Sequence, residues 1–125
     1  MDGDKPLEWV GSSLEDLSAF PDDVKRMMGF ALRSAQKGGK SAPVKSLAGF
    51  GSGKVMQISE DQDGNTYRAV YTVKFPKALY ALHAFQKKSK KGAETPKHVI
   101  DTIKERLKRA QEHYKKNYLK EKGNG

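Results

Sequence analysis

The stretch TYRAVYTVKFPKALYALHAFQKKSKKG, residues 66–92, reads as two β-strands joined by a tight turn and followed by a run of lysines. β-Branched and aromatic residues fill Thr66–Phe75 and Ala78–Phe85, as is typical of strands, and Pro76 interrupts them. Their nearly continuous apolar content predicts that both strands lie in the middle of a sheet. The arginine inside the first strand and the lysines after the second strand therefore require a structural or functional explanation.

A third strand is expected immediately before this pair. VMQISE (Val55–Glu60) has strand composition, and DQDGN (Asp61–Asn65) is a strong turn signal. The three strands predict an antiparallel meander. Further upstream, LEWV (Leu7–Val10) predicts a short first strand, and the Gly-, Ser- and Lys-rich segment Lys40–Lys54 predicts a loop.

Three helices complete the pattern. Ser12 opens a capping-box sequence, and Pro21 begins a second helix that Gly38 and Gly39 end. A long last helix is expected to start after Thr95 as its N-cap, with Pro96 as its first residue. Its buried face is predicted to consist of Val99, Ile100, Ile103, Leu107, Ala110 and Tyr114. Its exposed face is predicted to consist of Lys104, Arg106, Lys108, Arg109, Lys115 and Lys116.

The element order β-α-α-β-β-β-α predicts an α+β fold, with helices packed on a small twisted antiparallel sheet. The chain has 125 residues, of which 36% are hydrophobic and 31% charged, a composition that allows one folded core. We therefore predict a single domain over residues 1–118, followed by a frayed tail at 119–125.

The net charge of +9 is concentrated in the second half of the chain. Residues 1–62 carry 8 Lys+Arg against 9 Asp+Glu, and residues 63–125 carry 16 against 6, so the halves have charges of −1 and +10. A basic surface of this kind indicates a polyanionic partner, and phosphate backbones are the commonest one. The alternative is a lysine-rich surface that only confers solubility.

Several classes of protein and site are not expected. The chain has no cysteine, which excludes disulfides and thiolate metal sites. No apolar run approaches the ~20 residues that span a bilayer, and the acidic N-terminus does not resemble a signal peptide. We expect a cytoplasmic protein that uses no metal and no cofactor.

Alternation along the strand places Arg68 and Lys74 on the face opposite to Tyr67, Ala69 and Tyr71. The tyrosine face suits burial under helices. An arginine in a central strand is costly unless it is paired or faces a wet groove, so a structural ion pair and an anion site are both open.

The second strand ends in lysines that could converge with Arg68 on one phosphate. Lys87 and Lys88 are expected at the end of this strand, and Lys90 and Lys91 in the loop after it. Clustered cations of this kind would stabilise the extra negative charge of a pentavalent phosphorane, as RNA cleavage requires. His83, just upstream, is either a hydrogen-bonded core residue or a general base.

Four segments, taken in order, resemble the RelE/HigB toxins of bacterial type II toxin–antitoxin systems, in their phage-derived branch. The segments are SSLEDLSAFPDDVKRMMGFAL, VKSLAGFG, TYRAVYTVKF and LHAFQKKSKKG-x-x-TP. The resemblance implies a twisted antiparallel sheet with N-terminal helices on one face. It also implies a metal-independent endoribonuclease, that is, a hydrolase of the mRNA interferase type that cuts mRNA in the ribosomal A site. A helix-turn-helix antitoxin is implied as its partner.

The resemblance also implies roles for particular residues. Tyr67-Arg68 matches the family's strand motif, in which the arginine binds the scissile phosphate. Lys87-Lys88 matches its basic pair, with lysine in the second place. The general base is left open between His83, Tyr71 and one of the lysines. Further contacts to RNA are expected from Lys54, Lys74, Lys90, Lys91 and Lys97.

Two departures from the family keep other functions open. The stretch around Gln57 is uncharged where lysines are expected, and no tyrosine follows the basic pair. The first alternative is a ParE-like inhibitor of DNA gyrase on the same fold. The second is a basic RNA- or ribosome-binding protein without catalysis.

Overall fold

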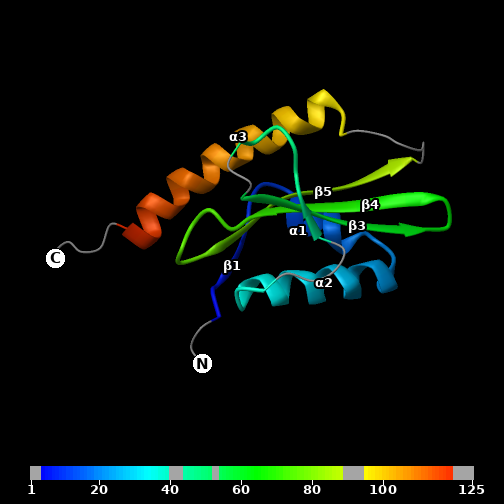
Figure 1. Ribbon diagram of the computed structural model, residues 1–125, viewed down its shortest axis with the longest axis horizontal. Coiled ribbons are helices and arrows are strands. Elements are labelled where there is room, and N and C mark those ends of the chain that lie inside the picture. Colours follow the sequence, from blue (N-terminus) through cyan, green and yellow to red (C-terminus); the bar gives the residue numbers. More distant parts are fainter. Residues whose placement is uncertain (1–3, 40–43, 52–53, 89–94, 120–125) are drawn as a thin grey trace.

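The computed structural model describes residues 4–39, 44–51, 54–88 and 95–119, which form a five-stranded sheet with helices on both faces (Figure 1). The strands are β1 (Leu7–Trp9), β2 (Val44–Ser46), β3 (Val55–Gln62), β4 (Asn65–Thr72) and β5 (Leu79–Lys88). The helices are α1 (Ser13–Ser18), α2 (Asp22–Gln36) and α3 (Lys97–Tyr114), and α3 continues into a short π-helix, η1 (Lys115–Leu119). The predicted α+β class is confirmed.

The predicted meander forms the centre of the sheet, whose strand order is β1-β5-β4-β3-β2. β3, β4 and β5 pair antiparallel, and β2 adds to β3 in the same sense. β1 joins β5 in parallel. The β3–β4 turn consists of Asp63 and Gly64, whose φ angles of 51° and 81° suit the two-residue turn that matches strand twist.

The strands differ from the prediction in several places. β3 continues to Gln62 and β5 to Lys88, each beyond its predicted end. Val44–Ser46 lies inside the segment predicted as a loop, because a three-residue edge strand is too short to show alternation in the sequence. β4 ends at Thr72 and not at Phe75. The Lys54 carbonyl still accepts the backbone N–H of Val73 at 3.0 Å and also accepts the Thr72 hydroxyl at 2.9 Å. The Thr72 hydroxyl in turn accepts the backbone N–H of Lys74 at 3.0 Å, so the chain turns away from β3 after Val73.

The two faces of β4 pack against different helices. Tyr67, Ala69 and Tyr71 share a core cluster with residues of α1 and α2, as predicted for this face. Val70 belongs to a second cluster, formed with α3. Figure 1 shows α2 and α3 on opposite sides of the sheet. The face that carries Arg68 is therefore partly covered by α3 and is not an open groove along its whole length.

The buried stripe predicted for the last helix packs in this second cluster. One residue predicted to lie on the exposed face of the helix is not exposed. Arg106 is half-buried: its guanidinium donates to the Leu82 carbonyl at 3.0 Å and to the Ser12 hydroxyl at 3.3 Å. The prediction that Arg106 is exposed was wrong, because the residue ties α3 to β5 and to the start of α1. The helix begins at Lys97, after Pro96 in an extended conformation and so one residue later than predicted.

The connection between β1 and α1 is shaped by the same arginine. Gly11 has a φ of +59°, and a Cβ atom there would lie 2.8 Å from Nε of Arg106, so both the backbone and the space require glycine. Ser12 precedes α1 as predicted, but its hydroxyl makes no cap bond. It donates instead to Asp16 at 2.7 Å, which leaves its lone pair for Arg106.

β5 contains one extra residue that reorients its second half. Val70 lies opposite His83, whereas the next residue, Tyr71, lies opposite Ala81, so Leu82 has no partner in the register. Such a bulge bends a strand and turns neighbouring side chains to the same side. Leu82 and His83 both face α3 as a result. Every second residue after His83, up to the end of β5, lies on the same face of the sheet as Arg68.

Candidate functional site

A cavity of about 450 Å³ opens on the face of the sheet that α3 partly covers. Its walls come from β2 and the turn after it, from the adjacent strands β3 and β4, and from the start of α3. The lining residues are Ser46, Leu47, Ala48, Gly49, Gln57, Arg68, Thr95 and Ile100. Half of these residues are polar or charged, and the volume lies within the range of ligand sites in proteins.

Arg68 is the charged residue among the described residues that line this cavity. It lies in the middle of β4, opposite Ser59 of β3 and Phe85 of β5. Its side chain is half-buried, and its Nε is shielded from water without a hydrogen-bond partner in the described segments. Those segments contain no ion pair with Arg68, so the structural salt bridge considered from the sequence is not seen there. The guanidinium is therefore suited to hold an anion from outside the chain.

Gln57 is a second polar residue of the cavity, and the sequence drew attention to it only as a departure from the family pattern. It lies on β3 opposite Val70, so it shares the face of Arg68 at a diagonal position. Its Oε1 atom is also buried without a hydrogen-bond partner among the described residues. The signal that could have identified it is parity: counted back from the two-residue turn Asp63-Gly64, Gln57 falls on the same face as Arg68.

Lys87 shares the face of Arg68 but stands nearer the end of the sheet. It lies opposite Thr66, two residues along β5 from Phe85, and is half-buried. Lys88 is the last residue of β5, opposite Asn65, and its side chain lies outside the described part of the structure. The structure thus brings Lys87 to the face of Arg68, without adding it to the cavity lining.

The remaining lysines predicted to bind RNA are spread over the molecule. Lys54 and Lys74 are exposed beside the Thr72 end of β4, away from Lys87 at the other end of the sheet. Lys97 is exposed on the first turn of α3, 3.4 Å from a carboxylate oxygen of Asp101. Lys90 and Lys91 lie outside the described residues.

His83 is engaged by Arg106 and does not line the cavity of Arg68. Its Nδ1 lies 3.3 Å from a guanidinium nitrogen of Arg106, and its ring packs on Phe85 with centroids 5.0 Å apart. A guanidinium only donates hydrogen bonds, so Nδ1 is the acceptor and the ring proton is on Nε2. Burial and the charge of Arg106 both lower the pKa of His83. The side chain is therefore a neutral imidazole at pH 7 with Nε2–H left to donate.

Tyr71 is separated from Arg68 by the sheet itself. It faces α2, is 1% exposed, and lines a different cavity with Lys5, Met56 and Val73. Burial raises the pKa of Tyr71 to about 12, which keeps the phenol protonated at neutral pH. The structure therefore does not bring Tyr71 to the face of Arg68.

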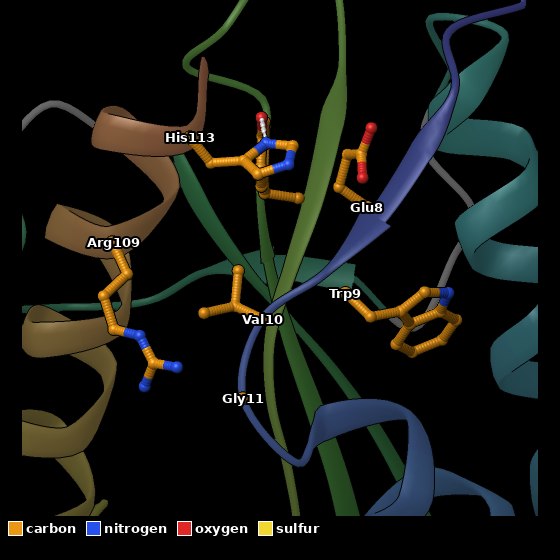
Figure 2. Close-up of a pocket in the computed structure, with 7 residues that line it drawn as sticks. Glu8, Trp9, Val10, Gly11, Arg109 and His113 are labelled. Atoms are coloured by element: carbon orange, nitrogen blue, oxygen red, sulfur yellow. Dashed lines mark hydrogen bonds between the residues drawn. The ribbon is translucent and has the colours of Figure 1, made fainter. Parts of the chain in front are cut away.

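A second group of polar side chains, which the sequence did not reveal, surrounds a pocket of about 170 Å³ between β1 and the end of α3 (Figure 2). The Tyr80 hydroxyl is 2.7 Å from Nδ1 of His113. Nearby, the Tyr118 hydroxyl donates to the Glu8 carboxylate. Figure 2 shows Glu8 and His113 at one end of this pocket and Arg109 at the other.

This second group fastens the C-terminal part of α3 to the sheet. Tyr114 adds to it, because its hydroxyl accepts the backbone N–H of Lys77 at 3.0 Å and its ring stacks on Tyr118. Burial, together with the bond to Glu8, raises the pKa of Tyr118 to about 12. Tyr118 therefore stays protonated and hydrogen-bonded to Glu8 at neutral pH, as a structural role requires.

Metal and membrane sites do not appear in the parts of the chain that the structure describes. No three His, Asp or Glu side chains in those parts gather as metal ligands would. None of the helices described there combines the length and the apolar character that crossing a bilayer requires.

Comparisons with known proteins identify one family. The sequence profile of the phage-derived Gp49-like proteins (DUF891) matches residues 15–108, which include α2, the whole meander, Arg68 and the first two thirds of α3. Neither the curated proteins nor the solved structures contain a match.

Proposed function

We propose that this chain, which belongs to the phage-derived Gp49-like family, a toxin-like family related to RelE/HigB, is the toxin of a type II toxin–antitoxin system. Its proposed activity is metal-independent cleavage of mRNA in the ribosomal A site, which stops translation. The observation that carries the proposal is Arg68, a half-buried cation without an ion-pair partner in the described residues, which lines a cavity of about 450 Å³.

The proposed chemistry needs little more than positioned positive charge. The 2′ oxygen of one nucleotide bonds to the adjacent phosphorus, and the 5′ oxygen of the next nucleotide leaves. A base takes the proton from the 2′ hydroxyl, and the leaving oxygen gains a proton. Arg68 would hold the phosphate and stabilise the extra charge of the transition state, a contribution usually worth about 10²–10³ in rate for one donor.

Lys87 and His83 are the residues on the same face that would assist Arg68. Lys87 stands at the end of β5, where the ladder with β4 fixes its backbone, so its charge is near the path of an RNA strand that crosses Arg68. His83 offers Nε2–H as a donor, because Arg106 occupies Nδ1. In this arrangement His83 would donate to a phosphate or leaving oxygen more readily than it would act as the base.

The proposed partners follow from charge and family. The net charge of +9 suits the ribosome, whose RNA is a dense polyanion. The proposed antitoxin carries a helix-turn-helix DNA-binding domain and neutralises the toxin by covering its functional face.

One observation favours the alternatives without RNA cleavage. The residues that line the cavity include no side chain that takes up a proton near neutral pH, so no general base touches the site of Arg68 in the described structure. A ParE-like gyrase inhibitor, or a basic ribosome-binding protein without catalysis, needs no such base.

Toeprinting on a translated message separates the three functions. The purified protein is added to ribosomes that translate a defined mRNA, and primer extension then maps breaks in the message. A cut within the A-site codon supports the proposal. The cut should persist when a chelator removes divalent cations other than Mg²⁺, which ribosomes themselves need. DNA breaks that depend on gyrase support the first alternative. Ribosome binding without either kind of break supports the second.

A further inference from the structure

Two residues that line the cavity each have a buried polar atom without a partner among the described residues. The two atoms are Oε1 of Gln57, an acceptor, and Nε of Arg68, a donor. Each is shielded from water, and leaving such an atom unpaired costs about 1–3 kcal/mol. Both residues also line the cavity, so a ligand there can bind the polar atoms of the two side chains that are not buried.

The register places the two side chains where one ligand can touch both. Gln57 lies opposite Val70, and Arg68 lies two residues away from Val70 on the same face. Such diagonal neighbours on an antiparallel pair are about 7–8 Å apart at the backbone. The cavity of about 450 Å³ that they share is within the range of sites for small ligands, about 300–1,000 Å³.

The chemistry of the pair selects the kind of ligand. Arg68 provides only donors and a positive charge, which suits a phosphate. Gln57 provides one donor and one acceptor in a plane, the pattern that meets the edge of a nucleobase. A rotation of the amide exchanges these two groups, so Gln57 can present its carbonyl oxygen to the cavity. Leu47 and Ile100 supply the apolar wall against which a base can lie.

We propose that Gln57 reads the base of the nucleotide whose phosphate Arg68 holds, and thereby sets the sequence preference of the protein. This inference rests on the proposed function, because it takes RNA as the ligand. Gln57 is then a specificity residue, with an amide in the stretch where the family resemblance leads one to expect charged lysines. Its loss is expected to change which sequences are bound and cut, while Arg68 still holds the phosphate.

Binding of the four nucleoside 3′-monophosphates to the purified, isotope-labelled protein tests the inference without any cleavage. The titrations follow the side-chain resonances of Gln57 and Arg68 by NMR. The wild type is expected to bind the preferred base at least about 5-fold more tightly than the poorest, the lower end of what one bidentate contact provides. In Gln57→Leu the four affinities should agree within about 2-fold. Arg68→Ala should weaken binding of all four.

Gln86→Leu is the matched control, because Gln86 is exposed on β5 opposite Tyr67, on the other face of the sheet. It should keep the wild-type order of affinities. The inference is overturned if the wild type binds none of the nucleotides at millimolar concentration, if it binds them equally, or if Gln57→Leu keeps the preference. The toeprint of the wild type tests the proposed function separately. If the wild type cuts mRNA but Gln57→Leu keeps the same base preference, this inference is overturned and the proposed function stands.

Discussion

Arg68 is a residue whose position in the structure is not explained by folding alone. A half-buried guanidinium loses part of its hydration, and without an acceptor in the described segments this loss is not offset. In the proposed function an external phosphate would offset it and would at the same time satisfy the fork of donors. Lysine in this place would keep the charge but lose the paired hydrogen bonds, so the two residues are not equivalent here.

His83 provides a test of the contacts around this face. In Arg106→Gln we expect the pKa of His83 to rise toward its ordinary value of about 6.5, because the neighbouring positive charge is removed. Burial remains the larger cause of the lowered pKa, so a partial rise is expected. NMR titration of the imidazole measures it. Arg109→Gln, an exposed arginine on the same helix, is the control and should leave the pKa of His83 unchanged.

At single positions the sequence predicted the face on which a side chain lies better than it predicted which residues surround that side chain. Alternation along the strand correctly placed Arg68 and Tyr71 on opposite faces, because the side-chain period of a strand is fixed. It could not show that Gln57 and Arg68 share a cavity, since this depends on strand register. Nor could it show that Arg106 turns inward, because a charged residue at that helical position is normally exposed.

The C-terminal end of α3 is held by tyrosine hydroxyls, and this attachment can be measured. Tyr118→Phe removes the hydrogen bond to Glu8 while keeping the ring on Tyr114. We expect the free energy of unfolding to fall by about 1–2 kcal/mol, because the bond has a charged acceptor and is partly exposed. Urea unfolding checks this. Lys116→Ala on the neighbouring exposed surface should change stability by less than about 0.5 kcal/mol, and equal losses in both variants would contradict the assignment.

Two lysine pairs can be compared: Lys87 and Lys88, which belong to β5, and Lys90 and Lys91, which follow in the sequence. Lys87 and Lys88 are held by the ladder with β4, and rigid charges are what transition-state stabilisation needs. Replacing both with Ala should lower the single-turnover cleavage rate at saturating ribosome by about 10²-fold or more. Replacing Lys90 and Lys91 should weaken binding and leave the saturated rate within about threefold.

These two double variants act as controls for each other, because each removes two positive charges. A rate that depends on Lys90 and Lys91 but not on the strand-end pair would contradict the proposed role of Lys87 and Lys88 in stabilising the transition state.

Among the elements, long and patterned segments were predictable and short ones were not. The meander and α2 have enough residues to show their periods, and the turn sequence Asp63-Gly64 identified the hairpin. β2 has three residues, and its pairing with β3 depends on contacts distant in sequence. The bulge at Leu82 left no sign in the sequence either, because strand composition continues through it.

For the whole molecule, the concentration of positive charge in residues 63–125 predicts strongly salt-dependent binding. Each phosphate contact releases counterions, with a log–log slope of roughly −0.7 per contact for single strands. Binding to the ribosome or to RNA should therefore weaken steeply between low and physiological salt. Filter binding or fluorescence titration across a severalfold range of salt measures the slope. An affinity that stays constant would contradict the view that the basic half of the chain contacts phosphates.

Cleavage of ribosome-bound mRNA by wild type and by Arg68→Ala tests the central claim most directly. We expect the wild type to cut within the A-site codon. Folded Arg68→Ala, with unchanged circular dichroism and melting temperature, should cut at least about 10²-fold more slowly, and Arg68→Lys should recover only part of the rate. A folded Arg68→Ala protein that cuts the message at the wild-type rate would contradict the account.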